Sequence, residues 1–102
     1  MAKCAVARLA DLNEESLTRV DVEGIPICLA RLTGGEVFAV NDMCSHEDIE
    51  LSDGDLDGDD VECPAHGSRF NVRTGEVSGL PAEDPVTTYP VTIEDGQIFV
   101  DV

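Results

Sequence analysis

The two histidines of this 102-residue chain each stand close to a cysteine. Cys44 and His46 form a C-x-H pair, Cys63 and His66 form a C-x-x-H pair, and residues 47–62 separate the two pairs. Thiolate and imidazole are both common ligands of zinc and of iron. The spacing therefore predicts two short loops that each offer one sulfur and one nitrogen ligand.

Three kinds of site could use these ligands. A structural zinc ion accepts two thiolates and two imidazoles, although zinc sites usually group Cys with Cys and His with His. A Cys–His catalytic pair with Cys63 as the nucleophile would explain only one of the loops. A [2Fe–2S] cluster whose cysteines hold one iron and whose histidines hold the other would use both loops, because each mixed loop can reach both irons.

The rest of the chain indicates strands that could position these loops. Its apolar residues alternate or run without a break, and they do not follow the 3.6-residue period of a helix. Asp95-Gly96 is a strong hairpin signal, and only residues 9–17 could form a short helical turn. The expected strands cover 3–8, 17–24, 25–32, 37–40 and two segments within 86–102. These signals predict an all-β domain of short antiparallel strands.

The segment between Asn41 and Pro85 has a different character, because glycine, aspartate and proline crowd into it. Its stretch DGDLDGDD, residues 53–60, copies the first half of a calcium-binding EF-hand loop, but Pro64 stands where that loop needs a glutamate. We interpret the stretch as an acidic hairpin between the two loops. Long irregular segments inside small β domains are usually functional, and both Cys–His pairs fall in this one.

Acidic side chains dominate the composition: 22 acidic and 6 basic residues give a formal net charge of −16. This charge argues against nucleic acid or an anionic membrane as a partner. It serves either solubility alone or docking onto a basic protein surface. The amino terminus lacks the apolar stretch of a secretory signal, and no segment approaches transmembrane length. We therefore expect a cytoplasmic protein with reduced thiols, which favours metal binding by the cysteines.

The sequence from residue 40 to residue 91 resembles Rieske-type [2Fe–2S] ferredoxins, and it is similar to the small electron carriers of bacterial aromatic-ring dioxygenase systems. The likeness includes both Cys–His pairs, Gly67 after the second pair, the turn at Thr74-Gly75 and the loop at Pro81. It implies a sandwich or partly open barrel with an inserted cluster-binding subdomain of two loops.

The resemblance also implies how the chain is divided and what it binds. Residues 1–102 would form a single Rieske domain, with a basal β domain over 1–41 and 83–102 and the cluster-binding subdomain over 42–82. One Rieske-type [2Fe–2S] cluster would be bound by Cys44, His46, Cys63 and His66. Four further residues would lie around the cluster: Gly67, Ser68, Phe70 and Pro81.

The chain departs from the high-potential members of this family in two ways. Those members have an additional cysteine in each loop, and the two form a disulfide, whereas this chain has Ala65 at the second-loop position. Ser68 matches a serine that bonds a bridging sulfide in them, but Phe70 stands where they have a tyrosine that bonds a ligand cysteine. Cys4 and Cys28 fall in expected strands, and we interpret them as reduced core residues.

The function implied by the resemblance is that of a one-electron carrier, not of an enzyme. A flavin-dependent NAD(P)H reductase would supply electrons, and the terminal component of a Rieske-type ring-hydroxylating oxygenase would receive them through a basic docking surface. The carrier is expected to be a monomer. Two alternatives stay open: an electron-transfer subunit of another complex, for example one linked to iron–sulfur metabolism, and a zinc-binding interaction module.

Overall fold

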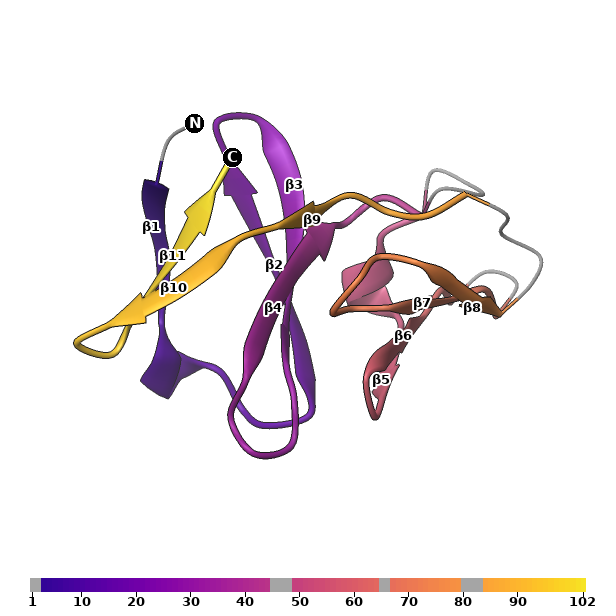
Figure 1. The fold of residues 1–102 in the computed structure, drawn as a ribbon, viewed down its shortest axis with the longest axis horizontal. Coiled ribbons are helices and arrows are strands. Elements are labelled where there is room, and N and C mark those ends of the chain that lie inside the picture. The colour runs from indigo at the N-terminus through magenta and orange to yellow at the C-terminus, as the bar shows by residue number, and fades with distance from the viewer. Residues whose placement is uncertain (1–2, 45–48, 65–66, 80–83) are drawn as a thin grey trace.

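The computed structural model describes residues 3–44, 49–64, 67–79 and 84–102. These residues form antiparallel strands and two single-turn 3₁₀ helices, Leu9–Asp11 and Leu51–Asp53, which confirms the predicted all-β class. Figure 1 shows two parts: both ends of the chain build the left part, and the middle of the chain builds the right part. No helix among the described residues is long and apolar enough to cross a membrane.

Two sheets form the left part, which we call the basal part. The first has the order β1-β11-β10 and the second the order β2-β3-β4-β9. Their strands are β1 (Lys3–Arg8), β2 (Ser16–Val22), β3 (Ile25–Arg31), β4 (Val37–Asn41), β9 (Thr88–Tyr89), β10 (Val91–Glu94) and β11 (Gln97–Asp101). The four strands expected over 3–8, 17–24, 25–32 and 37–40 are thus confirmed to within two residues, and the sheets are not closed into a barrel.

The right part, which we call the lobe, is built on a third antiparallel sheet with the order β5-β6-β7-β8. Its strands are short: β5 (Asp55–Asp57), β6 (Asp60–Glu62), β7 (Arg69–Asn71) and β8 (Val77–Gly79). The stretch DGDLDGDD supplies β5, the turn after it and the start of β6, and this is the acidic hairpin that the sequence predicted. The loop that leads from β6 to β7 carries the second Cys–His pair.

The continuous apolar run of β3 reflects its position between two cores. Ile27 and Leu29 belong to the core between the two basal sheets, whereas Cys28 and Ala30 belong to the core that the lobe shares. Alternate side chains of a strand point to opposite faces, so a strand that is covered on both faces must be apolar at every position. All four of these residues are fully buried.

Pro90 divides the last expected strand pair into three elements. The chain was expected to form two strands across 86–102, but β9 ends before Pro90 and β10 begins after it. β9 pairs with β4, whereas β10 pairs with β11, so the chain passes from one basal sheet to the other at this proline. A proline has no N–H to donate, which suits a residue between two ladders.

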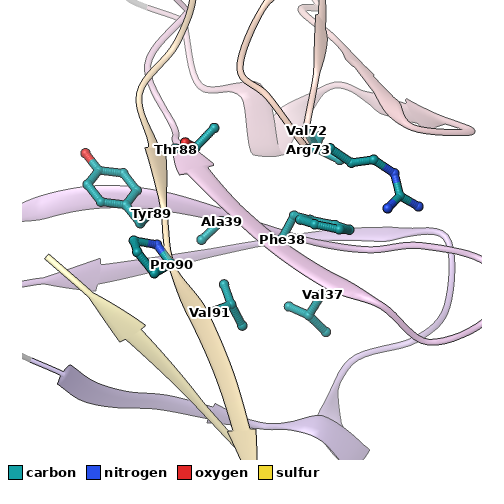
Figure 2. A pocket seen from close by; sticks show the side chains of 9 residues that line it. All are labelled: Val37, Phe38, Ala39, Val72, Arg73, Thr88, Tyr89, Pro90 and Val91. Carbon is teal, nitrogen blue, oxygen red and sulfur yellow. The ribbon is translucent and has the colours of Figure 1, made fainter.

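Arg73 connects the lobe to the basal part. Its guanidinium donates to both carboxylate oxygens of Glu36, at 2.7 and 3.3 Å, and forms an ion pair with Asp59 at 3.1 Å. It also lies 4.8 Å from the ring centre of Phe38. The hydrogen bond from Arg73 lowers the pKa of Glu36. Figure 2 shows Arg73 beside a groove of about 390 Å³ whose lining also includes Phe38 and Tyr89.

Gly75 is held where a turn of the lobe contacts the segment that leads back to β9 in the basal part. Its φ is +80°, and a Cβ built at this position would lie 2.2 Å from the backbone oxygen of Val86. The contact is so close because the Val86 N–H donates to the Gly75 carbonyl at 2.9 Å. Only glycine fits here, which explains the Thr74-Gly75 turn of the sequence.

Gly75→Ala should therefore lower the free energy of unfolding by about 3 kcal/mol or more, because backbone strain and a clash combine. Gly96→Ala is the matched control: its φ is +77°, but a Cβ there would meet no atom within 4 Å. The control should lose only about 1 kcal/mol. Urea denaturation of both variants measures the difference, and equal losses would contradict the importance of the Val86 contact.

Candidate metal centre

Cys44 begins the first loop, three residues after the end of β4 at Asn41. Its N–H donates to the carbonyl of Ile49 at 2.9 Å, and a single β-bridge joins Met43 to Glu50 just outside this bond. The Cys44 residue is buried, with 5% of its surface exposed. These contacts bring the two ends of the loop together across residues 45–48, which lie outside the described residues.

Cys63 begins the second loop, directly after β6, and this loop is closed in the same way. The Cys63 N–H donates to the carbonyl of Ser68 at 2.7 Å, and the Gly67 N–H donates back to the Cys63 carbonyl at 3.2 Å. Cys63 is 3% exposed. In both loops the cysteine N–H thus bonds the carbonyl five residues later, an equivalence that the unequal C-x-H and C-x-x-H spacings do not reveal.

The two cysteines belong to one core. Cys44 and Cys63 are members of the buried cluster that also contains Phe70 from the lobe and Val40 from the basal sheet. The structure therefore places in one core two cysteines that lie 19 residues apart in the sequence (63 − 44 = 19). His46 and His66 lie outside the described residues, and so does Pro81.

The remaining residues expected around the cluster are found next to this core. Ser68 and Phe70 are fully buried, and Phe70 is paired with Val61 and Val77 in the lobe sheet. The Phe70 ring thus serves core packing. Gly67 has a φ of +76°, and a Cβ there would meet no protein atom within 4 Å. The positive φ of Gly67 belongs to the turn that its N–H closes on the Cys63 carbonyl.

A backbone network anchors the first loop to the basal part. The Asp42 N–H donates to the Pro26 carbonyl at 2.9 Å, and the Leu51 N–H donates to the Asp42 carbonyl at 2.6 Å. The Asn41 side chain accepts from the Met43 N–H at 2.9 Å. Sequence reasoning missed Asp42. The only available signal was an aspartate directly after an apolar strand and two residues before a candidate ligand.

The other two cysteines have different surroundings. Cys28 is fully buried, and burial, followed by the nearby charge of Asp42, raises the pKa of its thiol. Cys4 is only half-buried. Of the two cysteines expected in the core, only Cys28 is therefore fully enclosed. No disulfide joins the four cysteines, all of which lie in the described part of the chain.

Arg69, on the neighbouring strand β7, neutralises part of the charge of the acidic hairpin. Arg69 forms ion pairs with Asp57 at 2.6 Å and with Asp60 and Glu62 at 3.7 Å. The hydrogen bond to Asp57 raises the pKa of Arg69, so this side chain stays charged. The exposed acids Asp53 and Asp55 stand at the start of the same hairpin.

The donors that the structure describes fit an iron–sulfur cluster. Two buried thiols that enter one core from separate loops can hold the same metal, and thiolate is the ligand that Fe–S clusters require. Their shielding from water also suits a redox group, since solvent exposure is one of the factors that set its potential. The same two thiols would also fit zinc, so the donor set alone leaves both metals open.

Comparison with known proteins distinguishes between an iron–sulfur cluster and a zinc ion. Residues 2–90 match the model of the Rieske [2Fe–2S] domain family. The chain is 44% identical over 95 residues to the 3-phenylpropionate/cinnamic acid dioxygenase ferredoxin subunit of Escherichia coli K12, with 92% of this chain and 88% of that protein covered. It is 45% identical over 93 residues to the ferredoxin component of the p-cumate 2,3-dioxygenase system of Pseudomonas putida, covering 90% and 79%.

A solved structure shows the same likeness in three dimensions. It is described as a complex of reduced oxygenase and oxidized ferredoxin in carbazole 1,9a-dioxygenase, and one of its chains superimposes with a TM-score of 0.91 at 34% identity. The match covers 96% of this chain and 100% of that one. The family match over most of the chain and these near full-length similarities lead to one conclusion: this protein belongs to the Rieske [2Fe–2S] domain family and is an electron-carrying ferredoxin with one Rieske-type cluster.

Proposed function

We propose that this chain carries single electrons from a flavin-dependent NAD(P)H reductase to the terminal oxygenase of a ring-hydroxylating dioxygenase system, as a monomer in the cytoplasm. The observation that carries the proposal is the near full-length similarity to a chain of the oxygenase–ferredoxin complex. The ferredoxin components of two aromatic dioxygenase systems support it as well. An electron-transfer subunit of another complex remains the alternative, and electron delivery to a purified oxygenase distinguishes the two.

We propose Cys44 and Cys63 as the ligands of one iron and His46 and His66 as the ligands of the other. The equivalent closure of the two loops and the shared core of the two cysteines support this assignment. When bound, the cluster supplies a one-electron redox centre. The chain's own contribution is to hold two thiolates in a buried place and to exclude water from them.

The same assignment explains why the chain does not act as an oxygenase by itself. A mononuclear iron site of that kind uses two histidines and a carboxylate. The chain contains two histidines in total, and both are used by the proposed cluster. The reaction with the aromatic substrate must therefore take place on a partner protein.

The first prediction concerns the metal. The purified protein should contain two irons and two inorganic sulfides per chain, and His46→Ala or His66→Ala should lose the cluster or change its visible spectrum strongly. Cys28→Ala is the matched control, because it removes a buried thiol that is not a proposed ligand. It should keep the cluster. A colourless protein with one zinc per chain and no sulfide would instead establish the zinc-binding alternative.

We further propose that docking uses a basic surface on the partner, supported by the net charge of −16 and by the exposed acids of the β5–β6 hairpin. Attraction between opposite charges speeds encounter, and dissolved salt screens it over about 8–10 Å at ordinary ionic strength.

Electron transfer to the oxygenase should accordingly slow as salt rises, by roughly tenfold or more between low and high ionic strength. At low salt, a double variant of the hairpin, Asp53→Asn with Asp55→Asn, should slow electron transfer. The control is a double variant of the basal part, Asp11→Asn with Asp95→Asn, which removes the same charge and should slow electron transfer less. Stopped-flow kinetics measures both comparisons. An electron-transfer rate that does not change with salt concentration would mean that the excess of acidic residues serves solubility only.

The cluster's potential should lie in the low part of the Rieske range, roughly −150 to 0 mV. Hydrogen bonds to cluster sulfurs favour the more negative reduced state and raise the potential, but Phe70 has no hydroxyl to donate. One bond contributing about 1 kcal/mol corresponds to roughly 40 mV, given about 59 mV per tenfold change for one electron.

Phe70→Tyr should therefore raise the potential by roughly 40 mV, and Ser68→Ala should lower it by a similar amount. Phe99→Tyr, a half-buried residue of β11, is the control and should leave the potential unchanged. Protein-film voltammetry measures all three variants. A wild-type potential well above zero would show that Ser68 and its surroundings outweigh the missing hydroxyl.

A further inference from the structure

We propose that Asp42 is a positioning residue of the cluster site, and that its buried negative charge, partly offset by Arg19, lowers the cluster's reduction potential. The proposal rests on the proposed function in one respect, because it takes Cys44 as a ligand. It concerns residues that lie outside both Cys–His pairs.

Asp42 is an unusual residue for a small β domain to bury. Its exposed fraction is 0%, and Asp42 and Ser68 are the two buried polar side chains among the described residues. A buried carboxylate is costly unless hydrogen bonds and a counter-charge compensate it. A buried carboxylate beside the first loop is therefore expected to have a role in that loop.

The contacts of Asp42 hold both ends of the first loop. One carboxylate oxygen accepts from the Ser52 N–H at 2.7 Å, and the other accepts from the Ser52 hydroxyl at 2.9 Å. The Asp42 carbonyl accepts from the Leu51 N–H at 2.6 Å. Asp42 precedes Cys44 by two residues, whereas Leu51 and Ser52 follow the loop's closing carbonyl. One residue thus joins the chain before the loop to the chain after it.

The charge of Asp42 reaches one residue of the core that contains the two cysteines. After burial, it is the second cause that raises the pKa of the Cys28 thiol, and Cys28 belongs to the same core cluster as Cys44 and Cys63. A negative charge that opposes the ionisation of one sulfur in this core also opposes the addition of an electron to a cluster bound there. Low-dielectric surroundings strengthen both effects.

Arg19 offsets this charge only in part. Its guanidinium lies 3.7 Å from the Asp42 carboxylate, and it also pairs with Asp21 at 3.1 Å and with Glu50. The Arg19 side chain is 36% exposed, so water screens it, whereas Asp42 is fully enclosed. We therefore expect Asp42 to leave a net negative charge beside Cys44.

The test is the reduction potential of Asp42→Asn in the full protein. Asparagine keeps the size of the side chain and can still accept from the Ser52 N–H, while the Ser52 hydroxyl can turn to accept from the new amide. We expect the equilibrium to shift about tenfold toward the reduced cluster, a rise of about 59 mV. Iron content and the visible spectrum establish that the cluster is present.

Arg19→Gln provides the second variant, and it should shift the potential in the opposite direction. Potential shifts of opposite sign would indicate a charge effect, because a loosened loop would shift the potentials of both variants in the same direction. Asp95→Asn in the β10–β11 turn removes the same charge as Asp42→Asn, and Arg8→Gln at the end of β1 removes the same charge as Arg19→Gln. Both controls should leave the potential unchanged.

The outcomes separate this inference from the ligand assignment. An intact cluster with an unchanged potential in Asp42→Asn, or an equal shift in Asp95→Asn, would overturn the inference and leave the ligands untouched. If Asp42→Asn holds no cluster, Arg19→Gln decides: a lowered potential supports the inference, and an unchanged or raised potential overturns it. Failure of the ligand assignment would appear separately, as an unaltered cluster in the histidine variants.

Discussion

The arrangement of this protein depends on one buried core that the lobe shares with the outer face of the β3–β4 sheet. Cys28, Ala30 and Val40 contribute from the sheet, while Phe70 and Val72 contribute from the lobe. The lobe strands have only three residues each, too few to enclose a core by themselves. The basal sheet supplies the missing apolar surface, and Cys44 and Cys63 are buried where the two parts meet.

This shared core explains how the first residue of each short loop is fixed in place. Each loop begins at a cysteine that is fixed from both sides: its side chain is packed in the core, and its N–H is bonded to the carbonyl five residues later. No disulfide is needed to hold the ends of either loop, because backbone hydrogen bonds already do so. The unequal Cys–His spacings therefore do not prevent the two loops from closing in the same way at their cysteines.

Ion pairs neutralise some acidic residues locally, although the whole chain stays strongly negative. Arg73 and Arg69 each bond the acidic residues nearest to them, and Arg73 also connects the lobe to the β3–β4 hairpin. These exposed pairs contribute little stability individually. Their larger effect is to reduce repulsion between the acidic residues of the lobe, while the chain as a whole keeps a strong negative charge.

The sequence by itself determined the β class, most of the strand positions, the acidic hairpin and the four candidate ligands. These features depend on local signals: alternation of apolar residues, Asp95-Gly96 at a turn, and cysteine next to histidine. The division at Pro90 was missed, because the proline's effect depends on the two different strands that β9 and β10 pair with.

Only the tertiary structure decided that Cys44 and Cys63 share a core, that both loops close on the fifth carbonyl, and that Asp42 is fully enclosed. Each of these facts joins residues that are distant in the chain, or depends on which face of a sheet is covered. A residue's burial is the sum of contacts from several elements, and no pattern within a single segment records that sum.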